Sequence, residues 1–453
     1  MGNEWTLYLL SELAHKITKG TTPTKKEGGF SSSGVNFIKA EAVTLNGTID
    51  ISKFAYITDE IYNKYKRSQL EENDILFSMA GVVLGKTAIV MREHLPANTN
   101  QALALIRPRS EVVYPKYLHY FLQQRSIFHY VNNSTAQSAQ PNINLQEIGE
   151  LEINVPSYSK QKAIALILGN IDDRIELNRK MNETLEAMAL ALFKSWFVDF
   201  DPVIDNALAS GKKVPEELAE RAAVRAALGD KRKPLPADIR ALFFDEFTFT
   251  DEIGWIPKGW EVGQMQDHSI IEMGQSPKGD TYNTDGIGVP LVNGPVEFGE
   301  YFAKKAKWTT SPTKLSEPGD LIVCVRGSTT GRYVKSDDRY CLGRGVCIFR
   351  AMRSQNFVDQ VYKQAYSNLL GLATGSTFPN WSRKTLSNFA VIAPKFNIID
   401  KYDSIVDTYV SRKEVNVRNS TLLTHLRDTL LPKLLSGELR IPDAEKIVTE
   451  AGL

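Results

Sequence analysis

The sequence contains few cysteines, no long apolar run and almost no net charge. Its three cysteines, Cys324, Cys341 and Cys347, are odd in number and lack metal-ligand spacing, so neither a disulfide framework nor a zinc site is supported. No run of about 18 apolar residues is present to cross a membrane, and charged residues interrupt the beginning of the chain where a secretory signal needs an apolar core. We therefore expect a soluble protein of the reducing cytoplasm.

The charge balance excludes a general polybasic coat. The 453 residues include 54 Lys and Arg against 53 Asp and Glu, a formal net charge of +1. Any polyanionic partner therefore has to be recognised by a local patch. Hydrophobic residues make up 42% and charged residues 24% of the chain, as in ordinary globular proteins rather than disordered or fibrous ones. The length predicts two or three domains.

An internal repeat covers most of the chain. Residues 5–23 and 260–277 both begin with Trp and end with Thr-Pro or Ser-Pro soon after a Gly. Four further segments read as short buried strands that correspond across the repeat: 35–39 with 289–293, and 74–81 with 320–327. From Asn142 to Trp196 the match with residues 380–434 has a constant offset of 238 and no gap, which indicates a rigid element rather than loops.

The rigid element is a predicted long helix in each half, over residues 161–195 and 398–435. At 1.5 Å per residue each helix would span about 50 to 57 Å, and apolar residues at steps of three and four indicate that it packs on a partner helix. The expected helix-pairing residues are Ile164, Leu168, Ile171, Ile175, Leu185, Leu192 and Trp196 in the first helix and Val406, Tyr409, Leu423, Leu430 and Leu434 in the second.

Polar residues interrupt both apolar stripes at equivalent places. They are Asn178 and Asn182 in the first helix and Asn416 and Ser420 in the second. One interpretation is that they form buried polar pairs, which fix the register of paired helices at some cost in stability. The other is that they lie on a solvated edge, and the sequence alone does not decide between the two.

These features predict a mixed α/β (α+β) protein with pseudo-twofold internal symmetry. The expected segments are a first globular region over 1–157, a long helix over 158–200, a connector over 201–259, a second globular region over 260–395, a long helix over 396–437 and a short solvated tail over 438–453. Antiparallel pairing of the helices as a coiled coil would hold the globular regions at a fixed separation. Proteins that read two DNA half-sites mirror the twofold symmetry of the duplex.

One string suggests nucleotide binding. Residues 80–87, Ala-Gly-Val-Val-Leu-Gly-Lys-Thr, follow a predicted strand and fit a relaxed P-loop pattern, in which backbone amides at a helix N-terminus hold phosphates. Residues 87–91 read as another strand, however, so the required helix is missing. We interpret the string as a Gly-rich loop that carries Lys86, and residues 326–333 as its counterpart with Arg332.

No other motif predicts catalysis. A Gly-rich S-adenosylmethionine fingerprint is absent, and residues 199–202 lack the second proline and the aromatic residue of an adenine methyltransferase motif. Residues 442–446 superficially resemble a nuclease carboxylate and lysine set, but they lie in the tail. The six histidines are scattered without partners for a metal or a nucleophile. We expect no catalytic residue, no metal and no cofactor on this chain.

Basic and polar loop residues suit DNA binding better. Residues 260–396 contain 16 Lys and Arg against 12 Asp and Glu, whereas residues 1–155 contain 15 of each. Cations contact phosphates, and amides and hydroxyls read base edges. The candidates are Lys19, Thr21, Thr22, Lys39, Lys86, Gln137, Asn142, Gln275, Ser276, Lys278, Asn293, Arg326, Ser328, Thr329, Arg332, Arg344, Ser376, Thr377 and Asn380. A solvated or helix-capping role would explain any one of them as well.

The chain resembles the specificity subunit of type I restriction-modification systems. The resemblance covers nearly the whole chain. It rests on the two Trp-to-Pro openings, the strands that begin at Asp74 and Asp320, the prolines Pro156 and Pro394 before the long helices, the connector, and the ending over 430–439. The beginning of the chain departs from the pattern, because it lacks the Ile-Pro-x-x-Trp lead found before Trp260.

The resemblance implies a non-catalytic subunit with two target recognition domains, each reading one half of a split site in double-stranded DNA. The long helices would form an antiparallel spacer that fixes the gap between the half-sites and docks two adenine methyltransferase subunits. Restriction subunits that hydrolyse ATP and cut DNA would join this core. S-adenosylmethionine, ATP and Mg would then be bound by the partner subunits and not by this chain.

Two alternatives stay open. The first is a scaffold or decoy that recruits methyltransferase subunits without reading DNA. The second is an ATP-binding enzyme that uses Lys86, in which Lys86→Ala would abolish nucleotide binding. If the chain reads DNA, we expect Lys86→Ala or Arg332→Ala to weaken binding and to lower its salt dependence, because a phosphate contact is lost.

Overall fold

The structure of the protein is a computed structural model that describes residues 5–81, 83–134, 142–229, 234–375 and 379–452. The chain divides into two compact units. The first comprises residues 1–177 and 419–453, and the second comprises residues 178–418. Each long helix therefore contributes one segment to each unit. Gln137, Ser376 and Thr377, three of the candidate residues, lie outside the described residues.

The first unit is built on a central sheet with the strand order β2-β8-β5-β6. Its strands are β2 (Ala14–Lys19), β5 (Ile75–Ser78), β6 (Thr87–Ile89) and β8 (Leu103–Pro108). In a second sheet, β3 (Val35–Ile38) pairs antiparallel with β4 (Ala55–Ile57) and parallel with β7 (Ala97–Thr99), while β1 (Thr6–Leu9) pairs with β9 (Glu152–Val155). The short helices are α1 (Asp59–Lys64), α2 (Pro115–Leu122), α3 (Arg125–Ser134) and α4 (Leu145–Gly149).

The second unit has the same plan. Its central sheet, in the order β13-β20-β17-β18, consists of β13 (Ser269–Met273), β17 (Leu321–Cys324), β18 (Tyr333–Lys335) and β20 (Val346–Ala351). Here β15 (Val289–Val292) pairs antiparallel with β16 (Trp308–Thr309) and parallel with β19 (Cys341–Leu342), β14 (Tyr282–Asn283) pairs with β16, and β12 (Glu261–Gln264) pairs with β21 (Ala390–Ala393). The internal repeat is therefore a repeat of topology.

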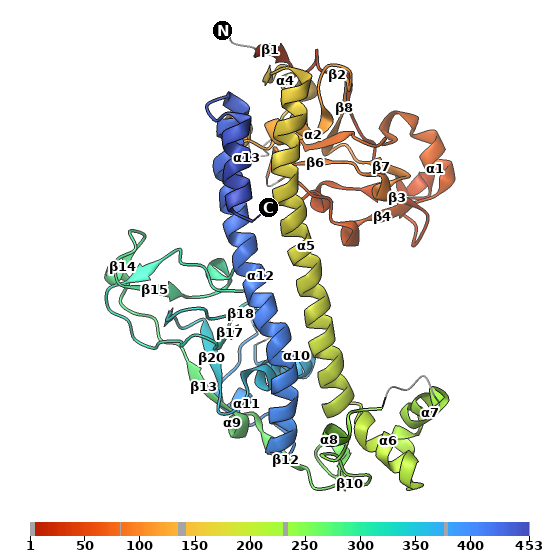
Figure 1. The fold of residues 1–453 in the computed structure, drawn as a ribbon, viewed down its shortest axis with the longest axis vertical. Helices are drawn as coiled ribbons and strands as arrows, with labels where there is room; N and C mark the ends of the chain where they lie inside the picture. The colour runs from red at the N-terminus through yellow and green to blue at the C-terminus, as the bar shows by residue number, and fades with distance from the viewer. Residues whose placement is uncertain (1–4, 82, 135–141, 230–233, 376–378, 453) are drawn as a thin grey trace. The chain divides into compact units, whose positions relative to one another are not determined.

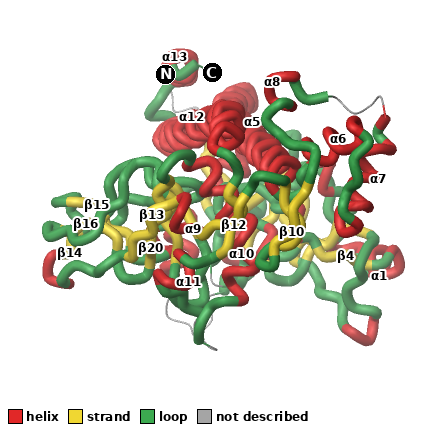
Figure 2. Tube along the Cα trace, turned by 90° about the horizontal axis from the view of Figure 1, so that it is seen from below, coloured by secondary structure: helices red, strands yellow, loops and turns green. Residues whose placement is uncertain are grey.

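The remaining elements of the second unit are helices and one hairpin. Its helices include α9 (Met265–His268), α10 (Gln355–Gly371) and α11 (Arg383–Ser387), and Figure 2 shows α9 and α11 close to the neighbouring strands β13 and β20. The connector forms α6 (Asp201–Ser210), α7 (Ala219–Ala227), α8 (Ala237–Arg240) and an antiparallel hairpin of β10 (Phe247–Thr250) and β11 (Gly254–Pro257). Within the connector the three helices therefore come first and the hairpin follows them.

One inner strand of each central sheet, β5 or β17, is almost entirely apolar because both of its faces are covered. In β5, Ile75 and Phe77 belong to one hydrophobic core and Leu76 to another. In β17, Leu321 and Val323 face one core while Ile322 and Cys324 face the other. Successive side chains of a strand point to opposite faces, so a strand buried on both sides reads as a continuous apolar run.

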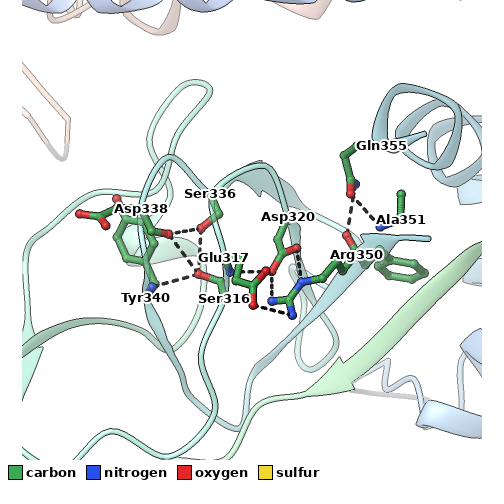
Figure 3. A network of polar contacts seen from close by, with 10 residues as sticks. Ser316, Glu317, Asp320, Ser336, Asp338, Tyr340, Arg350, Ala351 and Gln355 are labelled. Atoms are coloured by element: carbon green, nitrogen blue, oxygen red, sulfur yellow. Dashed lines mark hydrogen bonds and ion pairs between the residues drawn. The ribbon is translucent and has the colours of Figure 1, made fainter. Parts of the chain in front are cut away.

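A buried aspartate precedes each of these strands and anchors it to its neighbour. Asp74 accepts two hydrogen bonds from Arg107 of β8, at 2.8 and 2.9 Å. Asp320 accepts two from Arg350 of β20, at 2.9 and 2.7 Å, as Figure 3 shows. Two-point pairing of a guanidinium with a carboxylate fixes both groups in one plane. The same interaction thus holds equivalent strands together in both units.

In the first unit, segments of α5 (Tyr158–Phe197) and α12 (Phe396–Ser436) share one hydrophobic core with the globular region. Figure 1 draws these segments in yellow and blue. Of the expected pairing residues, Ile164, Leu168, Ile171, Leu423, Leu430 and Leu434 are buried in this core, and Ile175 packs against it. The core also includes Phe77 of β5 and Tyr117 of α2. The helix segments therefore cover the globular region as well as each other.

In the second unit, the remaining segments of the two helices run antiparallel. Asn182 of α5 contacts Asn416 of α12, Glu186 contacts Lys413, and Ala189 contacts Tyr402. Residue numbers rise along α5 while those of the partners in α12 fall, so the two segments run in opposite directions. Four further pairing residues lie in or against the core of this unit: Trp196 and Val406 are buried, and Leu192 and Tyr409 pack beside them. Leu185 is half-buried.

Two of the four polar interruptions of the helices are buried, and one of these is paired with a third. Asn416 Nδ2 donates to Asn182 Oδ1 at 2.9 Å, and Asn178 and Asn416 are only 3% and 1% exposed. Burial is confirmed for Asn178 and Asn416, so the solvated-edge interpretation is wrong for these two residues, whereas Asn182 and Ser420 are half-buried. A buried Asn pair favours a single alignment because a shifted register would leave its polar groups without partners.

A carboxylate of α5 joins α12 to the globular region in the first unit. Arg427 Nη1 donates to Asp172 Oδ1 at 2.8 Å, and the Tyr120 hydroxyl of α2 donates to Asp172 Oδ2 at 2.7 Å. Three elements thus meet at one side chain.

Glu186 has the same role in the second unit. Its oxygens accept from Lys413 of α12 at 2.5 Å and from Lys363 of α10 at 2.7 Å. Burial would raise the pKa of Glu186, but the two lysines outweigh this effect and lower the pKa to about 2. The carboxylate is therefore charged at neutral pH.

The interpretation of the last residues as a solvated tail is wrong. They form helix α13 (Ile441–Glu450), in which Ala444 and Val448 are buried in the core of the first unit. Pro442 occupies the first turn, where its missing N–H costs nothing. The residues that resemble a nuclease set are therefore part of a packed helix.

The described part of the chain contains no helix that combines the length and the apolar character needed to cross a lipid bilayer. The three cysteines are buried and form no disulfide.

The substitution Asn416→Ala tests the buried polar pair. It removes the donor and leaves the Asn182 amide oxygen without its partner, so we expect the free energy of unfolding to fall by about 1–3 kcal/mol. Urea titration monitored by circular dichroism measures the change. Asn419→Ala, at an exposed position of the same helix, should change stability by less than about 0.5 kcal/mol. Equal stabilities for the two variants would contradict the pair.

The substitution Glu186→Gln tests the ion pairs of the second unit. Because the pKa lies below its usual value of 4.5, the pairs stabilise fully above about pH 4.5, and this stabilisation is lost as the pH falls toward 2. Glu186 is 39% exposed, so we expect a modest loss of about 1–2 kcal/mol at pH 7. Thermal unfolding should show a larger destabilisation relative to the native chain at pH 7 than at pH 3, where part of the stabilisation is already lost.

Glu183→Gln is the matched control for this substitution. Glu183 lies on the same helix and is 62% exposed, so its removal should cost less than about 0.5 kcal/mol at either pH. A Glu186→Gln effect that is no larger than this, or that is the same at both pH values, would argue against the role of Glu186.

Candidate nucleic-acid interface

Three loops of the second unit meet at one end of its central sheet. Strand β13 ends at Met273, which faces Cys347 of β20, and β17 ends at Cys324, which faces Val346, the first residue of β20. The loops over 274–278, 326–332 and 343–345 therefore leave or enter the sheet at the same end. We call this the second sheet end.

Backbone hydrogen bonds hold these loops against one another. Gly274 N donates to Val346 O and Gln275 N to Leu342 O, each at 2.9 Å, and Val325 N donates to Gly345 O at 2.9 Å. A Cβ atom on Gly274 would lie 2.2 Å from the carbonyl oxygen of Gly343. Only glycine permits this approach, which explains the Gly in the repeated opening.

A polar segment completes the second sheet end. Asn380 forms bridges with Arg326 and Thr374, and Trp381 N donates to Val325 O at 3.0 Å. The Thr330 hydroxyl contacts the carbonyl oxygens of Gly327 and Pro379, both at 2.8 Å. The Gly-rich loop and the segment that follows α10 are thus joined by backbone and side-chain hydrogen bonds.

Cations gather at the second sheet end without carboxylate partners. Lys278, Arg326, Arg332 and Arg344 are exposed, and none of them forms an ion pair with another described residue. Arg350, by contrast, is bound to Asp320 in the core of the sheet. Unpaired guanidinium and ammonium groups around polar loops are suited to phosphate oxygens.

The first unit has an equivalent end, the first sheet end. Strand β2 ends at Lys19 and β5 at Ser78, beside the beginning of β8. Gly20 N donates to Asn100 O and Thr21 N to Thr99 O, each at 3.1 Å. A Cβ atom on Gly20 would lie 1.9 Å from the Thr99 carbonyl oxygen, so this position also requires glycine. Asn142 bridges to Ala80, as Asn380 does to Arg326.

Lys86 is bound within the protein. Its ammonium donates to the carbonyl oxygens of Ala40 and Val43, both at 2.7 Å, and burial lowers its pKa. Strand β6 begins at the next residue, so the expected absence of a P-loop helix is confirmed. Lys39 is also engaged, in an ion pair of 2.7 Å with Glu41. Contact of either lysine with DNA stays a prediction.

The structure brings most of the other candidates into two groups. At the first sheet end lie Lys19, Thr21, Thr22 and Asn142, and at the second lie Gln275, Ser276, Lys278, Asn293, Arg326, Ser328, Thr329, Arg332, Arg344 and Asn380. Asn293 joins the second group because its side chain fills the space beside Gly343. Among the described residues, no group of three His, Cys, Asp or Glu side chains is placed to hold a metal ion.

One residue of the first sheet end, and two lysines that follow its opening loop in sequence, are not among the candidates expected from the sequence. Gln101 is exposed, and its Oε1 accepts a hydrogen bond of 2.5 Å from the Thr22 hydroxyl. Lys25 and Lys26 follow the opening loop and are also exposed. Gln101 corresponds to Arg344 in the repeat, and an alignment of the two halves at this point would have identified it. The loops at residues 100–102 and 343–345 share no identical residue, so the sequence does not reveal the correspondence.

The salt dependence of nucleic-acid binding tests two cations separately, the exposed Arg332 and Lys86, whose ammonium is bound within the protein. Arg332→Ala should weaken nucleic-acid binding and reduce the slope of log K against log salt by about 1, because one phosphate contact is lost. For Lys86→Ala the expectation is revised: its ammonium already has two protein partners, so the slope should not change, although the first unit should lose stability. Fluorescence anisotropy over a series of KCl concentrations measures both slopes.

An unchanged slope for Arg332→Ala would argue that the Gly-rich loop of the second unit faces away from the nucleic acid. A reduced slope for Lys86→Ala would show that this lysine leaves its carbonyl partners to contact phosphate.

Comparisons with known proteins agree with the resemblance. Residues 2–187 match a family model described as the type I restriction modification DNA specificity domain. The chain is 24% identical to the putative type I restriction enzyme MjaX specificity subunit of Methanocaldococcus jannaschii, over 97% of this chain and 94% of that protein. It is 26% identical to the type I restriction enzyme HindI specificity subunit of Haemophilus influenzae, over 82% of this chain and 88% of the relative.

A solved structure has a similar fold. The S subunit of a type I restriction-modification system from M. genitalium aligns with 95% of this chain and 96% of its own, with a TM-score of 0.51 and 15% sequence identity. The mixed α/β class predicted from the sequence is confirmed. Residues 2–187 thus match the specificity-domain family, and the chain as a whole is similar to specificity subunits of type I restriction-modification systems.

Proposed function

We propose that this chain is the sequence-reading subunit of a type I restriction-modification complex and that each sheet end reads one half of a split DNA site. The observation that carries the proposal is the duplicated sheet end: two units with the same strand order present the same set of loops. A protein that repeats its reading surface is suited to two half-sites.

The chemistry of the two sheet ends supports DNA as the ligand. Free cations contact phosphates and set the position of the protein, while amide and hydroxyl side chains distinguish base edges. The second sheet end offers both kinds of side chain. Its cations include Arg326 and Arg332, and its amide and hydroxyl side chains include those of Gln275, Ser276 and Asn380. The candidate residues at both ends are proposed contacts on this basis.

The chain itself is not an enzyme, because the specificity subunits of these systems recognise DNA and leave catalysis to other subunits. We propose that two adenine methyltransferase subunits, with S-adenosylmethionine, dock on this chain. Restriction subunits, with ATP and Mg, would complete the complex in the cytoplasm.

The proposed domains follow the boundaries expected from the sequence. Residues 1–157 and 260–395 would be the two target recognition domains, residues 158–200 and 396–437 the spacer helices, residues 201–259 a connector and residues 438–453 the terminal segment. Support comes from α5 and α12, which are unbroken over 40 and 41 residues. An unbroken helix is a stiff element of fixed rise per residue, so we propose that its length sets the gap between the half-sites.

Methylation mapping tests the function. The chain is co-expressed with its methyltransferase partner, and methylated adenines are located across the host genome by sequencing. We expect a split motif with a constant gap that is absent when this chain is left out. A stable complex that adds no new methylation would favour the scaffold or decoy instead, and would overturn the proposed function.

Shortening both helices tests the spacer. Deletion of four residues from each helix near the Asn182–Asn416 pair removes about 6 Å of length, so we expect the gap in the methylated motif to change while both half-site sequences stay the same. The register pair itself is kept. A deletion in one helix only is the control, and should destabilise the protein because the two apolar stripes no longer match. An unchanged gap in the double deletion would contradict the spacer.

A further inference from the structure

We propose that Gln101 and Arg344 each read one base pair, at equivalent positions of the two half-sites, with Gln101 selecting adenine and Arg344 guanine. The inference rests on the proposed function, because it assigns one reader within each sheet end. It deepens that function from a surface to a pair of residues with stated base preferences.

The two residues occupy the same place in the repeated fold. Gln101 lies two residues after the end of β7 and two before the beginning of β8, and Arg344 has the same spacing from β19 and β20. Strand β7 pairs parallel with β3, and β19 pairs in the same way with β15. Both residues are therefore carried by the same turn of the same fold, one in each unit.

The opening loop of each unit contacts this turn through an equivalent hydroxyl residue. Thr22 Oγ1 donates to Gln101 Oε1 at 2.5 Å, and Ser276 Oγ accepts from the backbone N of Arg344 at 3.1 Å. Thr22 and Ser276 each stand two residues after the opening glycine and before a proline. The hydroxyl residue thus supports the proposed reader in both units.

The turn that carries each reader is fixed by backbone contacts. Thr21 N donates to Thr99 O at 3.1 Å and Gln275 N to Leu342 O at 2.9 Å, and the absent Cβ of Gly20 or Gly274 makes this approach possible. Base discrimination requires a side chain held in position by rigid supporting groups. These two turns meet that requirement.

Both side chains keep groups that can bind a base: Gln101 has its amide nitrogen and a second lone pair on Oε1, and Arg344 has its guanidinium. Gln101 and Arg344 are exposed. Within the described residues, the Gln101 Nε2 group has no hydrogen-bond partner and the Arg344 guanidinium has no carboxylate partner. A glutamine amide offers one donor and one acceptor, which match N7 and N6 of adenine, whereas the guanidinium offers two donors, which match N7 and O6 of guanine.

Exchange of the two side chains tests the assignment. Gln101→Arg and Arg344→Gln are made singly in the full chain, co-expressed with the methyltransferase partner, and methylated motifs are mapped. We expect Gln101→Arg to change one position of one half-site from adenine toward guanine, with a shift in relative methylation of about tenfold to a hundredfold. Arg344→Gln should change one position of the other half-site from guanine toward adenine.

Arg339→Gln is the matched control. It makes the same substitution at an exposed arginine that precedes β19, whereas Arg344 follows it. The motif should be unchanged. If an exchange variant does not yield soluble complex, Gln101→Ala and Arg344→Ala remove the side chain without adding bulk and should relax the same two positions to several bases.

The outcomes separate this inference from the proposed function. A motif in which every position is unchanged by the substitutions would overturn the inference and leave the proposed function intact. A uniform drop in methylation without a change of base preference would make Arg344 a phosphate contact and would also overturn it. If the native chain gives no split motif, the proposed function fails first.

Discussion

The core of each unit is completed by a pair of helix segments, and the reading loops depend on this burial. In the first unit Ile164 and Leu168 share a core with Phe77 of the central sheet, and in the second Trp196 and Val406 share one with Leu321 and Val323. One apolar face of each central sheet is therefore covered by elements that also pair with each other. Buried polar contacts such as Asn182–Asn416 then select one alignment.

The two units use one backbone plan to present different side chains. Lys86 is bound to two carbonyl oxygens, but its counterpart Arg332 is free, and Gln101 stands where Arg344 does in the repeat. The contacts that stabilise this backbone are the same in both units, whereas the exposed loop residues differ. The opening glycine and the aspartate-arginine pair occur in each unit. Such a division, with a common frame and variable loop residues, is suited to reading two unlike half-sites.

The sequence was a good guide to elements with strong periodicity. The long helices, the buried strands at residues 75–78 and 321–324, and the missing P-loop helix all follow from apolar patterns or local sequence. Helix α13 was missed because its short apolar pattern lies in a polar stretch and becomes stable only by burial of Ala444 and Val448. The partners of Lys86 and the place of Gln101 could not be predicted, since both arise from contacts between segments distant in sequence.

The central claim is that each sheet end contacts a different half of one DNA site. Photo-crosslinking in the assembled complex tests it most directly, with the crosslinking group placed at Lys19 of the first sheet end or at Lys278 of the second, both of which are exposed. The account predicts that each position crosslinks to bases or backbone of one half-site and that the two halves differ. Crosslinking of both positions to the same half, or of neither to the site, would contradict it.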